Sequence, residues 1–574
     1  MRILLIASAY NSLTQRVHAE LRERGHAVAV EVTPGSDDVR AAVQRHRADL
    51  IVAPLLKAVV PREVWSARTC LIVHPGPVGD RGPSSLDWAI HEDVREWGVT
   101  VLQADEEMDA GPVWATARFP LPPVGKSDLY RNELSDAAVE AVLLAVERFA
   151  SGRYVPVDQN SLPRRPHART RPVLRQETRR ISWAEDSTDT VLRALRAADS
   201  QPGVLDGLLG GEWFLHGGHP EHRLRGRPGE LLATRAGAVC RATVDGAVWI
   251  PELRARTGPG VPRACKLPAV TALAGRLSGL PERPAPALTA LTPMDDTAWS
   301  DIRYLEEGPV GILSFSFPGG AMSTDHCRRL LAAYRAARER PTEVLVLGGA
   351  RDFFSNGIHL GVIEAAADPA AESWANINAM DDLVEAVLDT TDRLVVGAIG
   401  GNAAAGGVML ALAADEVWCR SGSVLNPHYR LMGLYGSEYW TYTLPRRVGR
   451  TTAERLTEDA LPVTAARARD IGLVDRVVEC APSRFTDEVL LLAARLAASP
   501  LTRTRLAAKK TETDRRESDT PLAAVREREL ARMRATFFDP DAPYHALRRA
   551  FARKERATAH RVAADAASVR LADS

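Results

Sequence analysis

Short apolar runs alternate with amphipathic stretches over the first 120 residues of the chain. The runs have the length and aliphatic composition of buried strands, and the stretches between them carry apolar residues at helical spacing. This alternation predicts βαβ units and a parallel, Rossmann-like sheet. The expected strands cover residues 3–7, 27–32, 50–53, 70–73 and 99–104, and the expected helices cover 13–24 and 36–46. The first strand is not followed by the glycine-rich fingerprint of a dinucleotide site.

The pattern changes after a long helix that is expected at 127–151. A basic stretch broken by prolines, RRPHARTRPVLR at 164–175, indicates a linker. Short strands are expected beyond it, for example at 239–244 and 248–250, and the Asp245-Gly246 pair between these two is a strong hairpin signal. We therefore expect a small, β-rich, OB-like domain in this part of the chain.

A second α/β unit is predicted from about residue 305, after another proline-rich stretch at 281–293. Its apolar runs alternate with helical segments, and the Arg- and Ala-rich end of the chain from about 482 is predicted to be mostly helical. The fold class is therefore multidomain α/β. The predicted limits are 1–165 for the first domain, 166–280 for the second, 281–304 for a linker, and 305–574 for the third domain with a helical tail.

Composition narrows the class of protein. A chain of 574 residues is too long for one core, and its 73 basic and 73 acidic residues give no reason to expect a nucleic acid or an anionic membrane as partner. The six cysteines are scattered without a CxxC pair, which argues against a structural metal site and favours a reduced, cytoplasmic location. The apolar opening MRILLIASAY is too short for a secretory signal, and no run approaches the ~20 apolar residues that span a bilayer.

The first candidate site combines a histidine and an aspartate. His74 ends a predicted strand and begins HPGPVGDRGPSSLDWAI at 74–90, which places it at the carboxyl edge of the sheet, where open α/β sheets bind ligands. Asp109 follows the next strand in LQADEEMDAG at 102–111, beside a glycine that permits a tight turn. An imidazolium that stabilises an oxyanion and a carboxylate that fixes the ring suit acyl transfer. Either residue alone could instead satisfy a strand end or cap a turn.

These motifs, together with Ile181-Ser182-Trp183 and Pro202-Gly203, resemble the two-domain methionyl-tRNA formyltransferase group over roughly residues 1–270. The resemblance implies 10-formyltetrahydrofolate as the formyl donor. It places the pterin near Leu55 and Leu56 and beside the loop from Asp105 to Asp109. His74 and Asp109 are then the predicted catalytic residues of the first domain.

The chain departs from that family at Ile72, where the family has an asparagine whose amide helps to hold the oxyanion. The loss of one such donor typically costs ~2.7–4 kcal/mol of transition-state stabilisation. Two interpretations are open. Ser84 or Ser85 substitutes for the amide, or the acceptor needs less help, as a thiol would.

The second candidate site lies in the third domain. FFSNGIHL at 353–360 and GGNAAAGGVMLALAADEV at 400–417 resemble the oxyanion hole of crotonase-type, CoA-binding enzymes, the enoyl-CoA hydratase/isomerase fold. The resemblance assigns the two thioester-binding N–H groups to Ile358 and Gly406. A helix over 407–414 would add its positive N-terminal end to the same hole. A glycine pair before any helix looks similar, so the assignment depends on both motifs together.

Two missing glutamates limit the chemistry of this second site. Hydratases of the fold use two glutamates, and the matching positions here hold Met409 and His428. Water addition to a double bond is therefore not expected. His428 in NPHY and Glu438 and Tyr439 in GSEYW bring titratable groups to the region that faces the thioester. Packing or surface roles are the alternative for Glu438 and Tyr439.

The fused order of these motifs resembles the HypX (HoxX) family of hydrogenase maturation proteins over essentially the whole chain. The resemblance implies that formyl passes from 10-formyltetrahydrofolate to CoA, and that formyl-CoA is then decarbonylated to carbon monoxide and CoA. Carbon monoxide would become an iron ligand of a [NiFe] hydrogenase. Glu438, Tyr439 and His428 would share the acid and base duties in an open order, and no metal is implied. Expected partners are the small-molecule substrates and other hydrogenase maturation proteins.

Two rival functions remain at this stage. The first is a formyltetrahydrofolate hydrolase whose third domain only senses CoA. The second is a non-catalytic protein that delivers a formyl or CoA ligand to the hydrogenase assembly apparatus, against which the intact pair of His74 and Asp109 argues.

Overall fold

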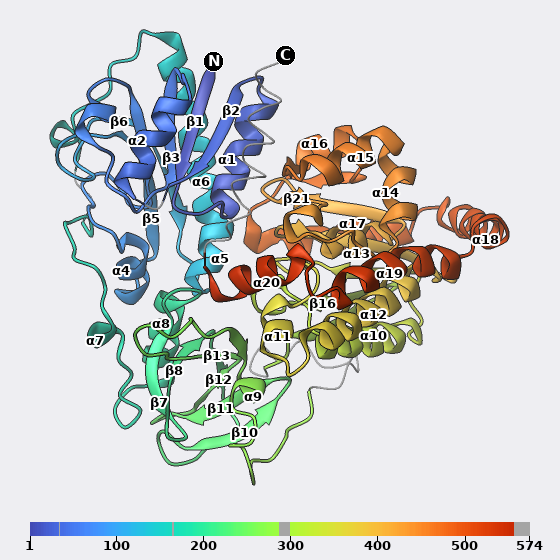
Figure 1. The fold of residues 1–574 in the computed structure, drawn as a ribbon. Helices are drawn as coiled ribbons and strands as arrows, with labels where there is room; N and C mark the ends of the chain where they lie inside the picture. Colours follow the sequence, from blue (N-terminus) through green and yellow to red (C-terminus); the bar gives the residue numbers. More distant parts are fainter. Residues whose placement is uncertain (34, 164–165, 286–298, 556–574) are drawn as a thin grey trace.

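The computed structural model describes residues 1–33, 35–163, 166–285 and 299–555. Three hydrophobic cores lie in the three successive parts of the chain, one for each predicted domain. Figure 1 shows the first part in blue, the second in green and the third in yellow to red, with the third packed against both of the others. No helix in these described ranges is long and apolar enough to cross a membrane.

The first domain is built on a six-stranded sheet of order β2-β1-β3-β4-β5-β6. Strands β1 to β4 are parallel, as predicted, but β5 and β6 are antiparallel to their neighbours, so the expectation of a wholly parallel sheet is wrong there. The elements are β1 (Arg2–Ala7), α1 (Ser12–Glu23), β2 (Ala27–Val32), α2 (Ser36–Arg45), β3 (Leu50–Leu55), α3 (Arg62–Trp65), β4 (Cys70–His74), α4 (Ser85–His91), β5 (Glu96–Gln103), β6 (Val113–Pro120), α5 (Lys126–Arg131) and α6 (Glu133–Ser151).

The single helix expected at 127–151 is instead two helices, α5 and α6, that meet at Asn132. The Asn132 backbone is not helical, with φ −113° and ψ −101°. Its side-chain amide donates to Asp128 Oδ1 (2.7 Å) and to the backbone oxygen of Arg351 (3.1 Å). Asparagine favours such local and tertiary hydrogen bonds over a continuous helix, and the break is the physical result.

The second domain consists of two four-stranded antiparallel sheets, in the orders β10-β11-β12-β9 and β14-β13-β8-β7. The hairpin predicted at Asp245-Gly246 is confirmed, because β11 and β12 pair with Ala242 opposite Ala247. The elements are α7 (Gln176–Arg179), α8 (Thr188–Ala198), β7 (Val204–Leu208), β8 (Gly211–His216), β9 (His219–Glu221), β10 (Leu231–Arg235), β11 (Ala238–Ala242), β12 (Ala247–Ile250), β13 (Glu252–Ala255), β14 (Lys266–Pro268) and α9 (Ala269–Ala272).

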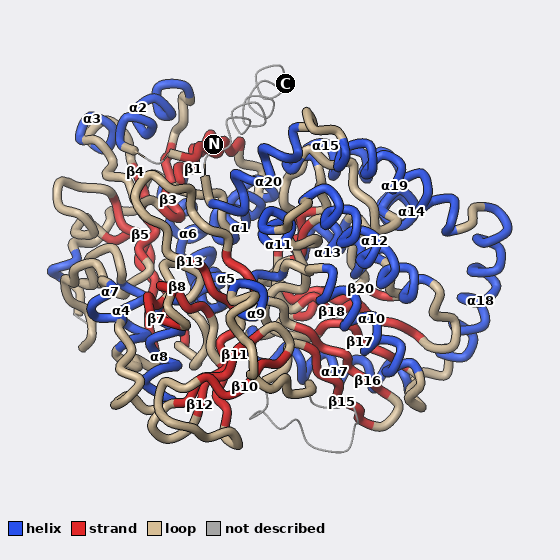
Figure 2. The backbone as a smooth tube through the Cα atoms, turned by 60° about the horizontal axis from the view of Figure 1, so that its bottom comes forward, coloured by secondary structure: helices blue, strands red, loops and turns tan. Residues whose placement is uncertain are grey.

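The third domain has a six-stranded sheet of order β15-β16-β17-β18-β20-β23 and a small sheet of order β19-β21-β22. Helices α10, α12 and α13 cover one face of the large sheet and α17 covers the other (Figure 2). Its strands are β15 (Ile302–Glu307), β16 (Val310–Phe315), β17 (Val344–Gly348), β18 (Leu394–Ile399), β19 (Ala403–Ala404), β20 (Glu416–Arg420), β21 (Val424–Asn426), β22 (Val463–Thr464) and β23 (Arg476–Val478). Its helices are α10 (Thr324–Arg338), α11 (Leu360–Ala365), α12 (Pro369–Leu388), α13 (Gly406–Leu412), α14 (Trp440–Val448), α15 (Arg450–Asp459), α16 (Ala465–Asp470), α17 (Phe485–Ala497), α18 (Thr502–Asp519), α19 (Leu522–Phe538) and α20 (Pro543–Arg553).

The domain limits stay a prediction. Most of the predicted 281–304 linker and the end of the predicted helical tail lie outside the described residues. Within the described part, β15 begins at Ile302, inside the range predicted as linker. The segment 164–175 is more than a linker, because Arg171 N–H donates to the Arg81 carbonyl (3.0 Å) and so pairs with the first domain.

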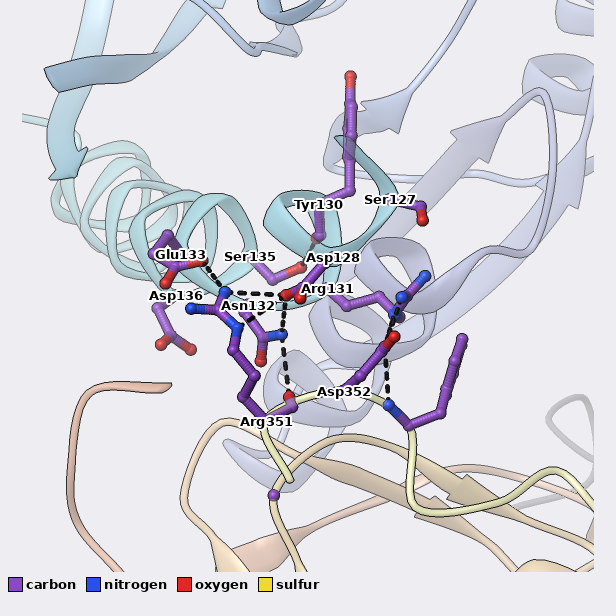
Figure 3. A network of polar contacts seen from close by, with 12 residues as sticks. Ser127, Asp128, Tyr130, Arg131, Asn132, Glu133, Ser135, Asp136, Arg351 and Asp352 are labelled. Carbon is purple, nitrogen blue, oxygen red and sulfur yellow. Dashed lines mark hydrogen bonds and ion pairs between the residues drawn. The ribbon is translucent and has the colours of Figure 1, made fainter. Parts of the chain in front are cut away.

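A network of ion pairs fastens the first domain to the third (Figure 3). Arg351 donates to Asp128 Oδ1 (2.8 Å) and to Glu133 Oε2 (2.7 Å), which lie on either side of the break between α5 and α6. Arg131 binds Asp352 in return. Burial and the neighbouring Asp352 carboxylate raise the pKa of Asp128, whereas Arg351 opposes that shift. The network is therefore a partly desolvated set of charges that depends on both of its arginines.

Two further polar contacts extend this interface. Arg420 of β20 is buried and donates to Asp136 Oδ2 (2.9 Å) and to Asn132 Oδ1 (3.2 Å) on the first domain. Glu23 at the end of α1 accepts hydrogen bonds from the backbone N–H (3.1 Å) and the hydroxyl (2.6 Å) of Thr464. The interface therefore reaches from the loop 351–353 to the small sheet of the third domain.

Removal of the arginine at the centre of this network should loosen the interface. Arg351→Ala leaves the Asp128 and Glu133 carboxylates desolvated without their partner, which we expect to cost about 2 to 3 kcal/mol. The matched control is Arg484→Ala, which removes a surface ion pair with Asp487 and should cost less than ~1 kcal/mol. Calorimetry of thermal unfolding measures both, and equal melting profiles for the two variants would contradict this role of Arg351.

Candidate active sites

The imidazole of His74 lies between two carboxylates at the end of β4. Its Nε2 is 3.0 Å from Asp80 Oδ2, and its Nδ1 is 3.5 Å from Asp109 Oδ1. All three side chains are nearly enclosed, and His74 is only 3% exposed. Asp109 is held in a left-handed backbone conformation with φ +56°, and its Oδ2 accepts from the Gly82 N–H (3.0 Å). The structure therefore brings together the predicted pair, with a second acid on the opposite side of the ring.

Close backbone approach explains the glycine in the His-Pro-Gly sequence. A Cβ on Gly76 would overlap Asp80 Oδ2 and lie 2.5 Å from His74 Nε2 and 2.7 Å from Ser85 Oγ. Only glycine leaves room for the hydrogen bond between His74 and Asp80. The Gly76 carbonyl is fixed in turn by the hydroxyl of Thr100 (2.8 Å) on β5.

The predicted folate-contacting residues occupy different parts of this edge. Leu55 ends β3, Leu56 follows it, and both are half-buried, whereas Asp105 is exposed and accepts from the Glu106 N–H (2.6 Å). The hydroxyls of Ser84 and Ser85 already have partners, since Ser84 accepts from the Leu174 N–H (3.1 Å) and Ser85 donates to the Pro75 carbonyl (2.8 Å). The serines are placed near the histidine loop, and their predicted roles stay predictions.

Asp80 and Arg171 are residues of the first site that sequence reasoning missed. Asp80 is 1% exposed and, besides His74, lies 3.3 Å from Arg171 Nη1. Arg171 is also buried, and its other nitrogen binds Glu92 (2.6 Å). Asp80 stands in the HPGPVGDRG motif and could have been marked as a second acid near His74. Arg171 carried no signal, because its stretch resembles an ordinary basic linker.

The two backbone N–H groups predicted for the second site lie on segments that pack against each other. An isolated bridge with Met322 holds Ile358, and Gly406 is the first residue of α13. A Cβ on Gly357, the residue before Ile358, would lie 3.3 Å from the Gly406 nitrogen. The backbones of the two segments are therefore in close contact. Within the described residues, neither N–H donates to a protein acceptor outside its own element. The assignment of these two N–H groups to an oxyanion hole stays a prediction.

Glu438 lies against the start of α13 at Gly406. A Cβ on Gly406 would overlap Oε1 of Glu438, which places that oxygen directly against the start of α13. The other oxygen, Oε2, accepts from the Tyr429 hydroxyl (2.8 Å) and from the Ser437 N–H (3.1 Å). Glu438 is 1% exposed, and burial raises its pKa to about 7. A carboxyl group poised near neutrality beside an oxyanion hole can take up or release a proton there.

The other predicted residues of the second site are not joined to Glu438 in the same way. In the described part of the chain, no hydrogen bond links the side chain of His428 to Glu438 or Tyr439, and burial lowers the pKa of His428 to about 4. Tyr439 follows Glu438 and has a buried ring, and burial raises its pKa well above the usual range. Met409 is fully buried inside α13.

Tyr429, Asp381 and Glu529 are the residues of the second site that sequence reasoning missed. Tyr429 was visible beside His428 in NPHY, but the sequence did not show which of the two contacts Glu438. Asp381 of α12 accepts from the Glu438 N–H (2.8 Å), and Glu529 of α19 accepts from the Tyr439 N–H (2.9 Å). Both acids stand in ordinary amphipathic helices without a motif, so no sequence signal could have found them.

Comparison with known proteins agrees with this division of the chain. Residues 33–146 match the formyl transferase family, 173–262 the formyl transferase C-terminal domain, and 315–552 the enoyl-CoA hydratase/isomerase family. The hydrogenase maturation factor HoxX of Bradyrhizobium diazoefficiens is 49% identical over 96% of this chain and 95% of its own. The crystal structure of HypX from Aquifex aeolicus in complex with tetrahydrofolic acid superposes with a TM-score of 0.92 at 43% identity, covering 97% of both chains.

A methionyl-tRNA formyltransferase from Sorangium cellulosum is 28% identical over 35% of this chain and 68% of its own length. The fold and its two sites thus define a fusion of a two-domain formyltransferase with a crotonase-like domain. More narrowly, the chain belongs to the HoxX (HypX) family of hydrogenase maturation factors. The family resemblance and the fold class predicted from the sequence are confirmed.

The crowding around Gly76 gives a test of the first site. Gly76→Ala should push the His74 ring away from Asp80 and lower the rate of formyl transfer about 100-fold, because displacement of catalytic groups by ~1 Å has effects of that size. Gly207→Ala is the matched control, since a Cβ there meets nothing within 4 Å. Tetrahydrofolate release from 10-formyltetrahydrofolate measures the rate. A Gly76→Ala enzyme with the wild-type rate would show that the contact between His74 and Asp80 is not needed.

Proposed function

We propose that the chain makes carbon monoxide in two steps, by formyl transfer from 10-formyltetrahydrofolate to the thiol of CoA and then by decarbonylation of formyl-CoA. The single observation that carries the proposal is the presence of both candidate sites on one chain, with a His–carboxylate pair in one and, in the other, a buried carboxylate against the start of α13 at Gly406. Membership of the family of hydrogenase maturation factors supports carbon monoxide as the product, since the resemblance implies that it becomes an iron ligand of a [NiFe] hydrogenase.

In the first step, His74 and its two carboxylates would act on the formyl carbon. Asp80 Oδ2 lies 3.0 Å from Nε2 of His74 and Asp109 faces Nδ1, so the two carboxylates would fix the orientation of the ring. Asp109 would accept the thiol proton as sulfur attacks the formyl carbon, and it would pass that proton to the folate nitrogen as the carbon–nitrogen bond breaks. A thiol gives up its proton far more readily than an amine. A thiol acceptor would therefore need less help from the protein, which is consistent with Ile72 in place of the asparagine of the formyltransferase family.

In the second step, the N–H groups of Ile358 and Gly406 would bind the formyl oxygen, and Glu438 would remove the formyl proton with Oε1. The carbon–sulfur bond then breaks with its electron pair on sulfur. Glu438 returns the proton to sulfur, so that formyl-CoA gives carbon monoxide and the CoA thiol without another reactant. The Tyr429 hydroxyl steadies the ionised form of Glu438 through Oε2. Tyr439 and His428 stay predicted participants.

The two steps can be separated by one experiment. Purified protein is mixed with 10-formyltetrahydrofolate and CoA, and reduced myoglobin reports carbon monoxide through its Soret shift. We expect a shift that depends on CoA and disappears with His74→Ala. Glu438→Gln should lose the shift but accumulate formyl-CoA, because it lacks only the proton acceptor of the second step. The exposed Glu454→Gln is the matched control and should behave as the wild type.

The same mixture tests the rival function. Release of formate at a rate that ignores CoA would indicate a formyltetrahydrofolate hydrolase with a CoA-sensing third domain, and would overturn the proposal. Unchanged gas output from Glu438→Gln would leave the first step intact and remove Glu438 from the second.

The pH dependence of the second step follows from the buried carboxyl of Glu438. A base acts in its ionised form, so the rate of carbon monoxide release from supplied formyl-CoA should rise with pH through an inflection near pH 7, where the pKa of Glu438 lies. The inflection should vanish in Glu438→Gln. A rate that falls through the same range would assign Glu438 the role of an acid instead.

A further inference from the structure

The loop that carries Glu438 has a strained backbone. Glu438 and Tyr439 both have φ of +59°, although neither is a glycine, and the two are consecutive. Left-handed conformations of such residues persist only where the surroundings over-determine them, and they cluster at functional sites. The conformation turns the carboxyl of Glu438 toward Gly406. Contacts with other parts of the fold must therefore hold Glu438 and Tyr439 in this conformation.

Two buried carboxylates from distant helices bind this turn at its backbone. Asp381 of α12 accepts from the Glu438 N–H (2.8 Å) and from the hydroxyl of Ser437 (2.8 Å). Glu529 of α19 accepts from the Tyr439 N–H (2.9 Å) and from the N–H (2.8 Å) and hydroxyl (2.5 Å) of Thr441. Asp381 is fully buried and Glu529 is 1% exposed. The N–H groups of Glu438 and Tyr439 thus each donate to a different buried carboxylate.

Helix α19 contributes more than this one residue. Met533 Sδ lies 3.2 Å from the Gly436 nitrogen, immediately before the turn, and Arg526 Nε lies 3.9 Å from Asp381 Oδ2. In Figure 1 this helix runs across α12 and α13, and it belongs to the C-terminal helical tail, far along the chain from the helix α13 that begins at Gly406. The burial of an acid is expensive, and here it is repeated on both sides of one loop.

We propose that Asp381 and Glu529 are positioning residues for the decarbonylation step, which clamp the turn at Glu438 and Tyr439 so that the Glu438 carboxyl stands against the Gly406 N–H. The inference rests on the proposed function of the second site and adds the C-terminal helix α19 to that site. Neither residue contacts the thioester itself; both act through the backbone that they bind.

A pair of variants at Asp381 supplies the second readout. Asp381→Asn keeps the shape and an acceptor for the Glu438 N–H, and its amide can donate to Ser437, so the turn should persist. Asp381→Ala removes that acceptor and should release the Glu438 N–H from the clamp.

The experiment follows each half-reaction in the full-length protein. Glu529→Ala should lower the kcat of carbon monoxide release from supplied formyl-CoA about 100-fold, with KM nearly unchanged and with formyl transfer to CoA at the wild-type rate. Glu527→Ala, an exposed acid on the same helix, is the matched control. Asp381→Asn should stay active, whereas Asp381→Ala should lose about 100-fold in kcat with KM nearly unchanged, because only the asparagine keeps an acceptor for the Glu438 N–H.

The outcomes separate the two hypotheses. If the wild-type protein releases no carbon monoxide from formyl-CoA, the proposed function itself fails. If the wild type releases carbon monoxide and Glu529→Ala matches it, the positioning role is overturned. Should Glu529→Ala not fold, the two Asp381 variants decide alone, because an Asp381→Ala enzyme with the kcat of Asp381→Asn contradicts the clamp. A crystal structure of Asp381→Asn in which φ of Glu438 stays near its wild-type value supports it.

Discussion

The ion pairs between α5 and the loop 351–353 are the interaction on which the joint architecture depends. Arg351 and Asp352 precede, without a break in the chain, the segment 353–358 that ends at Ile358 and its N–H. Asp128, Arg131 and Glu133 belong to the formyltransferase half. The same contacts that fasten the first domain to the third therefore fix the loop of the second site.

Both sites contain ionisable side chains that are buried away from water, which the surrounding residues must stabilise. In the first, His74 lies between Asp80 and Asp109, and Arg171 from the connecting segment neutralises part of the excess negative charge. In the second, the Glu438 carboxyl is surrounded by other acids and by hydrogen-bond donors, and burial raises its pKa. In both, a glycine next to the functional side chain allows backbone and side chain to approach without a Cβ between them.

Sequence reasoning succeeded where the signal is local. The strands before His74 and the start of α13 at Gly406 follow from periodicity and from glycine pairs, and the Asp245-Gly246 hairpin follows from its turn residues. Sequence reasoning failed where hydrogen bonds to distant residues override the local pattern. The helix expected at 127–151 breaks at Asn132, because the Asn132 amide binds Asp128 and the third domain, and the linker at 164–175 pairs with the edge of the first site through Arg171.

By itself, the sequence determined the order of the domains, the identity of His74, Asp109, Ile358, Gly406 and Glu438 as the groups to consider, and the absence of the two hydratase glutamates. Only the tertiary structure decided which acids surround them. Asp80 is six residues from His74 and its contact could be suspected, but Asp381 and Glu529 reach the 437–441 loop across sequence separations of 57 and 90 residues. Motifs record chemistry that is contiguous along the chain, whereas burial and hydrogen bonding between distant helices exist only after the cores have packed.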